Sequence, residues 1–360
     1  MRVFVLLLSL HAVHGVIFFS TSDPDFNTAP PSGELAGSGW EYQGQWGRFL
    51  GTPIAPEYFV TAKHVGGAVG DVFLLGGVDY KTIAFFDDPH SDLRICRVQG
   101  EFSEYAELNS SKEELGESVV VFGRGTRRGA EVRLDDSSRD TLKGWLWGPG
   151  DGRLRWGENQ VGRISLPTDS SRSERAVPLV PESDFLVMTF DAGETPNESH
   201  LSAGDSGGGV FIPDGNDWKL AGVNFAVSGP YNTENEGTGF QAAIFDETGL
   251  WIGGPNKWRS SSDFGFPEPG AFYSTRISSS LPWIEGILSQ QGSGGPPVLQ
   301  SAISVDGLFV DEKEAVVDVE GQIVEVNLPA ETRFYRLRGE APERIRNVRI
   351  GDGRLIFTYE

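Results

Sequence analysis

Short apolar runs separated by turn-forming residues recur along nearly the whole sequence. They stand at 58–62, 72–75, 93–98, 119–122, 185–190, 210–212 and 220–227. The 47 glycines and 21 prolines are spread without a repeat, which is typical of many short strands joined by tight turns. One helical pattern appears late, between a capping Ser280 and Gly292, with Pro282 in its first turn. The sequence therefore predicts an all-β fold with a single late helix.

The two ends of the 360-residue chain differ from its middle. The start, MRVFVLLLSLHAVHG, has a basic Arg2, an apolar run and then small or polar residues, and it resembles a secretory signal peptide. Near the other end, QGSGGPP has the composition of a linker and is followed by alternating apolar and polar residues. We expect a signal peptide at 1–15, a main domain at 16–290, a linker at 291–297 and a small β module at 298–360.

Charge and cysteine content limit the compartment and the partners. The N-terminal apolar run is far shorter than the roughly 20 residues that span a bilayer, so we expect a secreted or periplasmic protein without a membrane anchor. The formal net charge of −21 would repel nucleic acids and anionic lipids. Cys96 is the single cysteine, which allows no internal disulfide and is read as a packing residue. We predict no metal and no cofactor, and the oligomeric state stays open.

Three polar residues at the ends of apolar runs match the needs of acyl transfer. Such chemistry requires a nucleophile, a base, a group that orients the base, and donors for the oxyanion. His64 ends a run in YFVTAKHVGG, Asp92 opens one in HSDLRICRV, and Ser206 lies in AGDSGGGVF. Gly204 and the tight turn through Ser206 can direct two backbone N–H groups at one point, as an oxyanion hole requires.

Four stretches, VTAKH, DLRICRV, GDSGG and FYSTRISSSLPWI, resemble the landmark stretches of the chymotrypsin-like serine peptidases and occur in that family's order. The resemblance implies two antiparallel six-stranded β-barrels over about 16–290, with the site between them and a C-terminal helix. The chain would cross between barrels near 119–125. The pattern without disulfide cysteines resembles bacterial members of the family.

The same resemblance assigns roles to individual residues. His64 would be the general base, Asp92 its orienting partner and Ser206 the nucleophile, with the amides of Gly204 and Ser206 as the oxyanion hole. Asp87 and Asp88 lie in the same stretch, but only Asp92 directly precedes the apolar run.

Asp205, the acid before the nucleophile, pairs in the family with an amino group freed by activation. The family's usual activation sequence is missing from this chain. Signal cleavage after Gly15 would expose Val16, whose ammonium group we expect to pair with Asp205 as structural support for the site.

The resemblance also implies a substrate pocket. Its base would be His200, six residues before the nucleophile, and one wall would be the run Phe225, Ala226 and Val227. Val227 resembles the elastase-like arrangement, which favours small, uncharged residues. The alternative is an acidic preference, since a charged His200 would pair with a substrate carboxylate. Insertions around 144–164 and between 227 and 272 are expected to border the cleft.

The sequence therefore predicts a secreted serine endopeptidase that acts on polypeptides. Two other interpretations stay open. One is a catalytically inactive binding protein on the same fold, and the other is an esterase that uses the same chemistry. The sequence does not indicate a function for the module at 298–360.

Overall fold

The computed structural model describes residues 15–136, 139–165, 184–193, 195–264, 269–289, 298–304, 307, 309–318, 321–338, 345–351 and 353–359. The expected signal peptide, apart from residue 15, and the expected linker at 291–297 lie outside the described residues. Among the described residues, no helix is both long enough and apolar enough to cross a bilayer.

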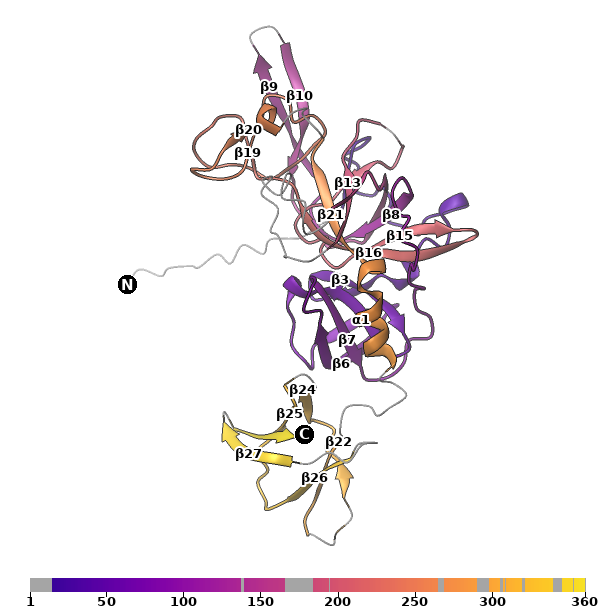
Figure 1. The fold of residues 1–360 in the computed structure, drawn as a ribbon, viewed down its shortest axis with the longest axis vertical. Coiled ribbons are helices and arrows are strands. Elements are labelled where there is room, and N and C mark those ends of the chain that lie inside the picture. The colour runs from indigo at the N-terminus through magenta and orange to yellow at the C-terminus, as the bar shows by residue number, and fades with distance from the viewer. Residues whose placement is uncertain are drawn as a thin grey trace, which may run out of the picture.

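The first half of the main domain is a closed six-stranded antiparallel barrel (Figure 1). Around the barrel the strand order is β2-β3-β4-β7-β6-β5. Its strands are β2 (Gly44–Trp46), β3 (Phe49–Ala55), β4 (Tyr58–Ala62), β5 (Val72–Leu75), β6 (Val78–Asp87) and β7 (Leu93–Val98). Aromatic side chains from several of these strands form a buried cluster, in which Phe59 stacks on Phe73 with ring centroids 4.0 Å apart.

The second half is a rolled antiparallel sheet with seven strands in the order β11-β8-β15-β16-β21-β13-β12. They are β8 (Ser118–Gly123), β11 (Arg155–Gln160), β12 (Arg163–Ser165), β13 (Phe185–Thr189), β15 (Gly209–Asp214), β16 (Asp217–Val227) and β21 (Ala271–Arg276). The all-β fold of a closed barrel and a second, barrel-like sheet is thus confirmed. The second sheet is one strand wider than expected.

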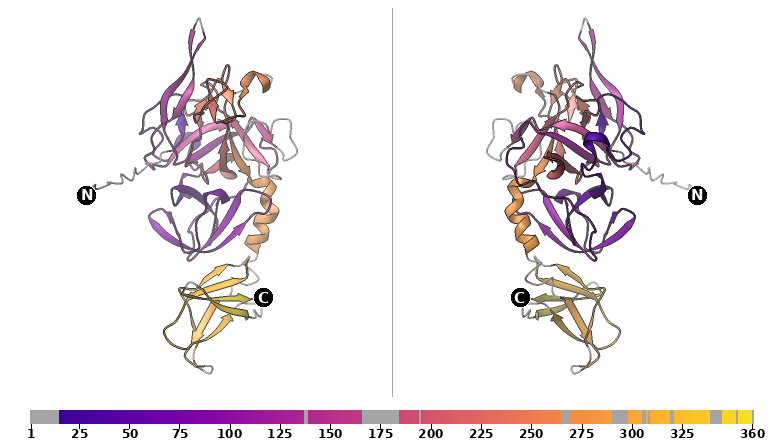
Figure 2. Two further views of the ribbon diagram at one scale, coloured as in Figure 1. Left: turned by 90° about the vertical axis from the view of Figure 1, so that its left-hand side faces the viewer. Right: turned by 90° about the vertical axis from the view of Figure 1, so that its right-hand side faces the viewer.

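Helix α1 (Ile277–Ser289) follows β21 without a loop and lies along the first barrel (Figure 2). Its expected start at Ser280 is wrong, because the helix begins three residues earlier and Pro282 lies inside it. Buried contacts to the segment between β7 and β8 explain the early start, because Ser278 donates to Glu114 Oε1 at 2.6 Å. The hydroxyl of Ser280 donates to Asp88 Oδ2 at 3.1 Å.

A continuous hydrophobic core joins the two halves. It contains Val60 and Ile95 from the first barrel, Phe122 and Phe211 from the second sheet, and Ile284 from α1. Every one of these side chains is buried. Because interiors are close-packed, this shared core fixes the position of one sheet against the other.

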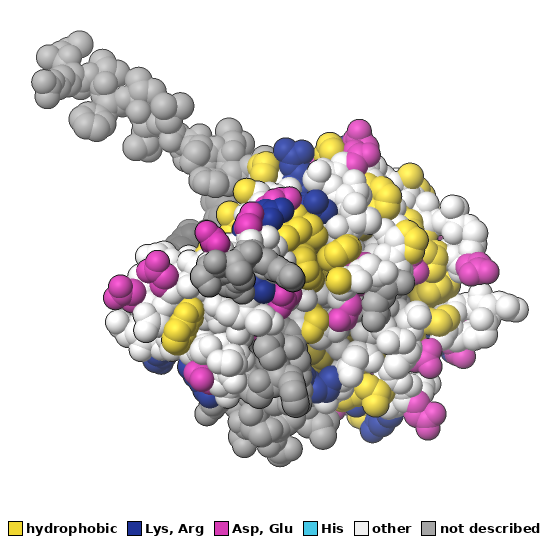
Figure 3. Space-filling model, turned by 90° about the horizontal axis from the view of Figure 1, so that it is seen from above, with side chains coloured by type: hydrophobic (Ala, Val, Ile, Leu, Met, Phe, Trp, Pro, Cys, Tyr) yellow, Lys and Arg dark blue, Asp and Glu magenta, His cyan; other side chains and the backbone are white. Residues whose placement is uncertain are grey.

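Two additional three-stranded sheets are formed by segments inserted between the strands of the second sheet. The hairpin of β9 (Arg128–Asp136) and β10 (Arg139–Trp147) pairs with β18 (Ala242–Ile244) and extends away from the body (Figure 1). A second small sheet holds β17 (Tyr231–Asn232), β19 (Trp251–Ile252) and β20 (Arg259–Ser260). Seen from the side that carries these elements, hydrophobic, acidic and basic side chains are mixed on the surface (Figure 3). The 3-10 helices are η1 (Gly33–Leu35), η2 (Trp40–Tyr42), η3 (Lys63–Val65) and η4 (Ser261–Phe264).

The C-terminal residues form two sheets around a core of their own, which includes Leu299, Val324 and Phe357. The first sheet has the order β23-β22-β26, with β22 (Val298–Ala302), β23 (Val310–Asp311) and β26 (Phe334–Arg338). The second has the order β24-β25-β28-β27, with β24 (Val316–Asp318), β25 (Ile323–Asn327), β27 (Ile345–Gly351) and β28 (Arg354–Tyr359). β24 lies beside β6 of the first barrel.

Candidate active site

Strand pairing brings His64 and Asp92 together. β4 pairs with β7 so that Ala62 stands opposite Leu93, which places the residues just beyond the two strand ends side by side. The backbone N–H of His64 donates to Asp92 Oδ1 at 3.0 Å, and His64 Nδ1 lies 2.5 Å from Asp92 Oδ2. The Asp92 side chain is 7% exposed and that of His64 is 39% exposed. A buried carboxylate thus orients a ring that still reaches solvent.

Ser206 reaches the same histidine from the second sheet. It lies in the turn before β15, and its Oγ is 2.9 Å from His64 Nε2. The backbone N–H of Leu50 in β3 donates to the Ser206 carbonyl at 3.4 Å, which ties this turn to the first barrel. With Nδ1–H donating to Asp92, Nε2 is the ring atom that accepts a hydrogen bond from the Ser206 hydroxyl. The structure therefore brings together all three residues that the sequence singled out.

The other nearby acids have different partners. Asp87 forms an ion pair with Arg94, whose Nε lies 2.5 Å from Asp87 Oδ1. Asp88 accepts a hydrogen bond from the Ser91 hydroxyl at 2.6 Å, in addition to the one from Ser280. Each of these two carboxylates thus has a polar partner of its own.

Backbone conformation and close packing require glycine at several positions around Ser206. Gly204 adopts φ +101° and Gly207 adopts φ +79°, conformations that residues with side chains rarely reach. A Cβ atom at Gly207 would lie 2.2 Å from the Leu50 carbonyl oxygen, and one at Gly208 would lie 2.1 Å from that of Phe122. Among the described residues, no acceptor pairs with the backbone N–H of Gly204 or Ser206. These two amides are therefore free to bind an oxyanion.

Asp205 lies fully buried behind the turn. Its carboxylate accepts hydrogen bonds from the backbone N–H groups of Gly125 at 2.6 Å and Ser202 at 2.7 Å, and from the Ser202 hydroxyl at 3.0 Å. Burial raises the pKa of Asp205 to about 6, although these donors lower it. No basic side chain of the described ranges forms an ion pair with this carboxylate. A buried carboxylate without a cation is costly when it is ionised.

The backbone nitrogen of Val16 is the remaining neighbour, 3.3 Å from Asp205 Oδ1. Val16 is 1% exposed and adopts φ +47°, which is strained for a β-branched residue. A Cβ atom at Gly15 would lie 2.3 Å from the Gly123 carbonyl oxygen, so the chain just before Val16 is tightly confined. The expected neighbours, Val16 and Asp205, thus lie next to each other.

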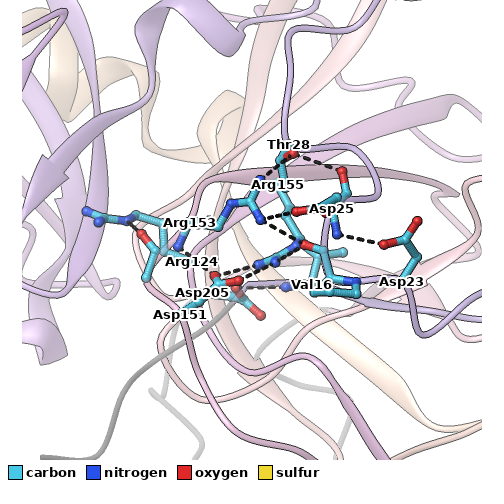
Figure 4. Close-up of polar contacts among 11 residues, drawn as sticks. Val16, Asp23, Asp25, Thr28, Arg124, Asp151, Arg153, Arg155 and Asp205 are labelled. Atoms are coloured by element: carbon cyan, nitrogen blue, oxygen red, sulfur yellow. Dashed lines mark hydrogen bonds and ion pairs between the residues drawn. The ribbon is translucent and has the colours of Figure 1, made fainter.

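Two arginines fix the chain that follows Val16 (Figure 4). Arg155 is 1% exposed, donates to both oxygens of Asp151 at 3.0 and 2.7 Å, and donates to the Pro24 carbonyl at 2.5 Å. Arg153 pairs with Asp25 and donates to Thr28 Oγ1 at 3.0 Å. Further upstream, β1 (Ile17–Phe18) pairs with β14 (Ser199–His200). The position of Val16 beside Asp205 is therefore part of the folded structure.

A cavity of about 150 Å³ opens beside Ser206. Phe225, Ala226 and Val227 line it, and Trp147 from the β9–β10 hairpin contributes to the lining. Asp205 also borders this cavity, but its oxygens are already occupied by the donors described above. Among the described residues, the cavity therefore has mainly apolar walls, and its one ionisable lining residue, Asp205, already has hydrogen-bond donors.

His200 does not line this cavity, which corrects the expectation that it forms the pocket base. Its side chain is 0% exposed and its ring packs between Phe190 and Phe272, with centroids 5.5 and 5.7 Å away. Nδ1 lies 2.6 Å from the Leu201 carbonyl oxygen, and burial lowers the pKa of His200 to about 4. The physical reason is the β1–β14 pairing, which places His200 opposite Ile17 in the core.

No family model matches this chain, and no curated protein matches it. Among solved structures it is similar to neuropsin, a serine protease expressed in the limbic system of mouse brain. The similarity has a TM-score of 0.39 and 14% sequence identity, and it covers 71% of this chain and 97% of neuropsin. This likeness concerns the fold alone.

Proposed function

We propose that the chain is a serine endopeptidase with a chymotrypsin-like fold, exported from a bacterial cell. The observation that carries the proposal is the hydrogen-bonded series from Asp92 through His64 to Ser206, with distances of 2.5 and 2.9 Å. This series comes from both halves of the fold. It lies beside a mainly apolar cavity and the backbone amides of Gly204 and Ser206, which have no acceptor among the described residues.

The geometry supports a two-step hydrolysis. His64 Nε2 takes the Ser206 proton as Oγ attacks the scissile carbonyl carbon, and Asp92 stabilises the imidazolium that forms. The amides of Gly204 and Ser206 bind the oxyanion. The imidazolium then gives its proton to the leaving amine, which leaves an acyl-Ser206 ester. Water, deprotonated by His64, hydrolyses this ester and restores the Ser206 hydroxyl.

A matched pair of substrates tests this proposal. We expect the purified protein to hydrolyse both a peptide ester and the corresponding peptide amide, with acyl-enzyme formation limiting the amide reaction. Hydrolysis of the ester alone would favour the esterase interpretation. Turnover of neither substrate by folded protein that begins at Val16 would favour the inactive binding protein.

The cavity predicts cleavage after small, uncharged residues such as Ala or Val. Placing an unpaired charge against its apolar walls is unfavourable, so cleavage after Arg or Lys should be about a hundredfold less efficient or worse. The alternative of an acidic preference loses its basis, because His200 is buried away from the cavity and its pKa of about 4 leaves it neutral at pH 7. Profiling cleavage sites in a mixed peptide library is the measurement. Predominant cleavage after Arg, Lys or Glu would contradict this pocket assignment.

Residues 298–360 are expected to be dispensable for the chemistry. All proposed catalytic groups and α1 precede them, and the module has its own core. A protein truncated after Gln291 should therefore hydrolyse a short peptide ester at close to the rate of the full chain. A truncated protein that folds, as judged by circular dichroism, but has lost this activity would show that the module contributes to the site.

A further inference from the structure

Phe225 occupies an irregular position in its strand. β16 pairs with β21 so that Asn224 stands opposite Ser274 and Ala226 stands opposite Tyr273. Phe225 is therefore an extra residue, and the register shifts around it. Such a β-bulge breaks the alternation of a strand and redirects a side chain, often beside a functional site.

The redirected ring contacts His64. The ring centroids of Phe225 and His64 are 5.6 Å apart and the planes meet at 77°, an edge-to-face arrangement. On its other side, Phe225 stacks on Phe185 at 5.1 Å and 15°. Phe185 is 4% exposed and packs in turn against Tyr273 at 6.3 Å. The His64 imidazole therefore packs against a series of aromatic rings, Phe225, Phe185 and Tyr273, that belong to the second sheet.

Hydrogen bonds at the two ring nitrogens leave one motion of the imidazole weakly restrained. Asp92 and Ser206 hold Nδ1 and Nε2, but the ring can still tilt about the line that joins these atoms. Packing on an aromatic ring opposes this tilt, and small misplacements of a catalytic group reduce rates strongly.

The same phenylalanine also lines the cavity beside Ser206, together with Ala226 and Val227. A substrate side chain in this cavity would contact the ring that supports His64. Binding of substrate and alignment of the base therefore share one side chain.

We propose that Phe225 is a positioning residue that holds the His64 imidazole in line between Asp92 and Ser206 and couples this alignment to occupancy of the cavity. The proposal rests on the proposed function, because it assigns Phe225 a role in supporting the catalytic base. The bulge, the series of aromatic rings and the shared cavity wall are the observations that carry it.

Phosphonylation of Ser206 by a small dialkyl fluorophosphonate separates positioning from substrate binding. In this reaction Oγ displaces fluoride at phosphorus, His64 takes the proton, and no substrate side chain needs to fill the cavity. We expect Phe225→Ala to lower the second-order rate constant of labelling about tenfold, and Phe225→Tyr, which keeps the ring, to restore most of it. With peptide substrates, Phe225→Ala should lower kcat as well as raise KM.

Val227→Ala provides the comparison within the same cavity, because Val227 has no ring to pack on His64. This variant should alter KM for peptides more than it alters the labelling rate. If Phe225→Ala does not fold, Phe225→Leu keeps apolar bulk without the ring and should show the same direction of change.

Folded Phe225 variants without the ring that label at the wild-type rate, with only KM changed, would overturn the proposal and leave Phe225 as a cavity wall. Failure of the wild-type protein to label would instead count against the proposed function itself.

Discussion

Replacing Ser206 with alanine is expected to abolish peptide hydrolysis while leaving the fold intact. Ser206 Oγ is 2.9 Å from His64 Nε2, and among the described residues it is the hydroxyl that is hydrogen-bonded to this nitrogen. Loss of one member of such a triad typically costs on the order of 10⁴-fold or more in kcat. The measurement is kcat for a peptide substrate alongside the thermal unfolding midpoint of Ser206→Ala.

Ser279→Ala is a matched control for this variant. Ser279 lies in α1, and its hydroxyl donates to the carbonyl of Arg276, the last residue of β21, at 3.1 Å. The control should keep full activity. If Ser206→Ala also retained activity close to that of the wild type, the assignment of the nucleophile would be wrong.

A free amino group at Val16 is expected to convert a pH-sensitive, poorly active protein into a stable, active one. In the uncut chain, the peptide nitrogen of Val16 lies 3.3 Å from Asp205 Oδ1 but carries no charge. The pKa of Asp205 is raised by burial from 3.8 to about 6, so the folded state holds a proton that the unfolded state has lost between these pH values. The free energy of unfolding therefore falls as the pH rises from about 4 to 7, by about 2 kcal/mol.

An ammonium group at Val16 reverses this effect, because an adjacent positive charge favours the ionised carboxylate. The form that begins at Val16 should keep its free energy of unfolding between pH 4 and 7. The form that retains residues before Val16 should lose stability over this range and have lower activity. Urea unfolding of both forms at pH 4.5 and 7 is the measurement, and the same pH dependence in both would contradict the pairing.

The amino terminus of the active protein gives a second, independent check of this pairing. We expect sequencing of active, exported protein to begin at Val16. A start well downstream of Val16 in fully active material would exclude this mode of activation.

The three residues of the proposed triad could be located from the sequence because each stands near the end of a strand or in a short, glycine-rich turn. His64 and Asp92 adjoin the neighbouring strands β4 and β7, and the register of this pair follows from the apolar pattern of the two strands. The β-strands of the first barrel likewise follow from local alternation and turns, whereas their closure into a barrel was implied only by the resemblance to the chymotrypsin-like peptidases. The strands themselves depend on signals that lie within a few residues of each other.

The pocket depends on contacts between distant segments and was predicted less well. His200 turns into the core because Ile17, far away in the sequence, pairs with it. Trp147 lies at the base of the β9–β10 hairpin, opposite Arg128, and no local pattern places it beside the cavity. The bulge at Phe225 interrupts an otherwise regular apolar run, so alternation alone gives no sign that the side chain faces His64.

The start of α1 was misplaced for a similar reason. Capping and proline rules favoured a start at Ser280, but Ser278 bonds to Glu114, and Arg276 pairs with the same carboxylate at 2.6 Å. These tertiary contacts bury the chain directly after β21 and extend the helix backward. Local propensity is a weak guide where buried polar partners are supplied from elsewhere in the chain.

The central claim is that His64, held by Asp92, makes Ser206 a nucleophile. The most direct test is to treat the protein that begins at Val16 with a fluorophosphonate and to locate the adduct by mass spectrometry. We predict a single adduct on Ser206, formed rapidly in the wild type, slowly in His64→Ala and not at all in Ser206→Ala. The absence of an adduct on Ser206 in folded protein, or an equal rate of labelling in His64→Ala, would contradict this account.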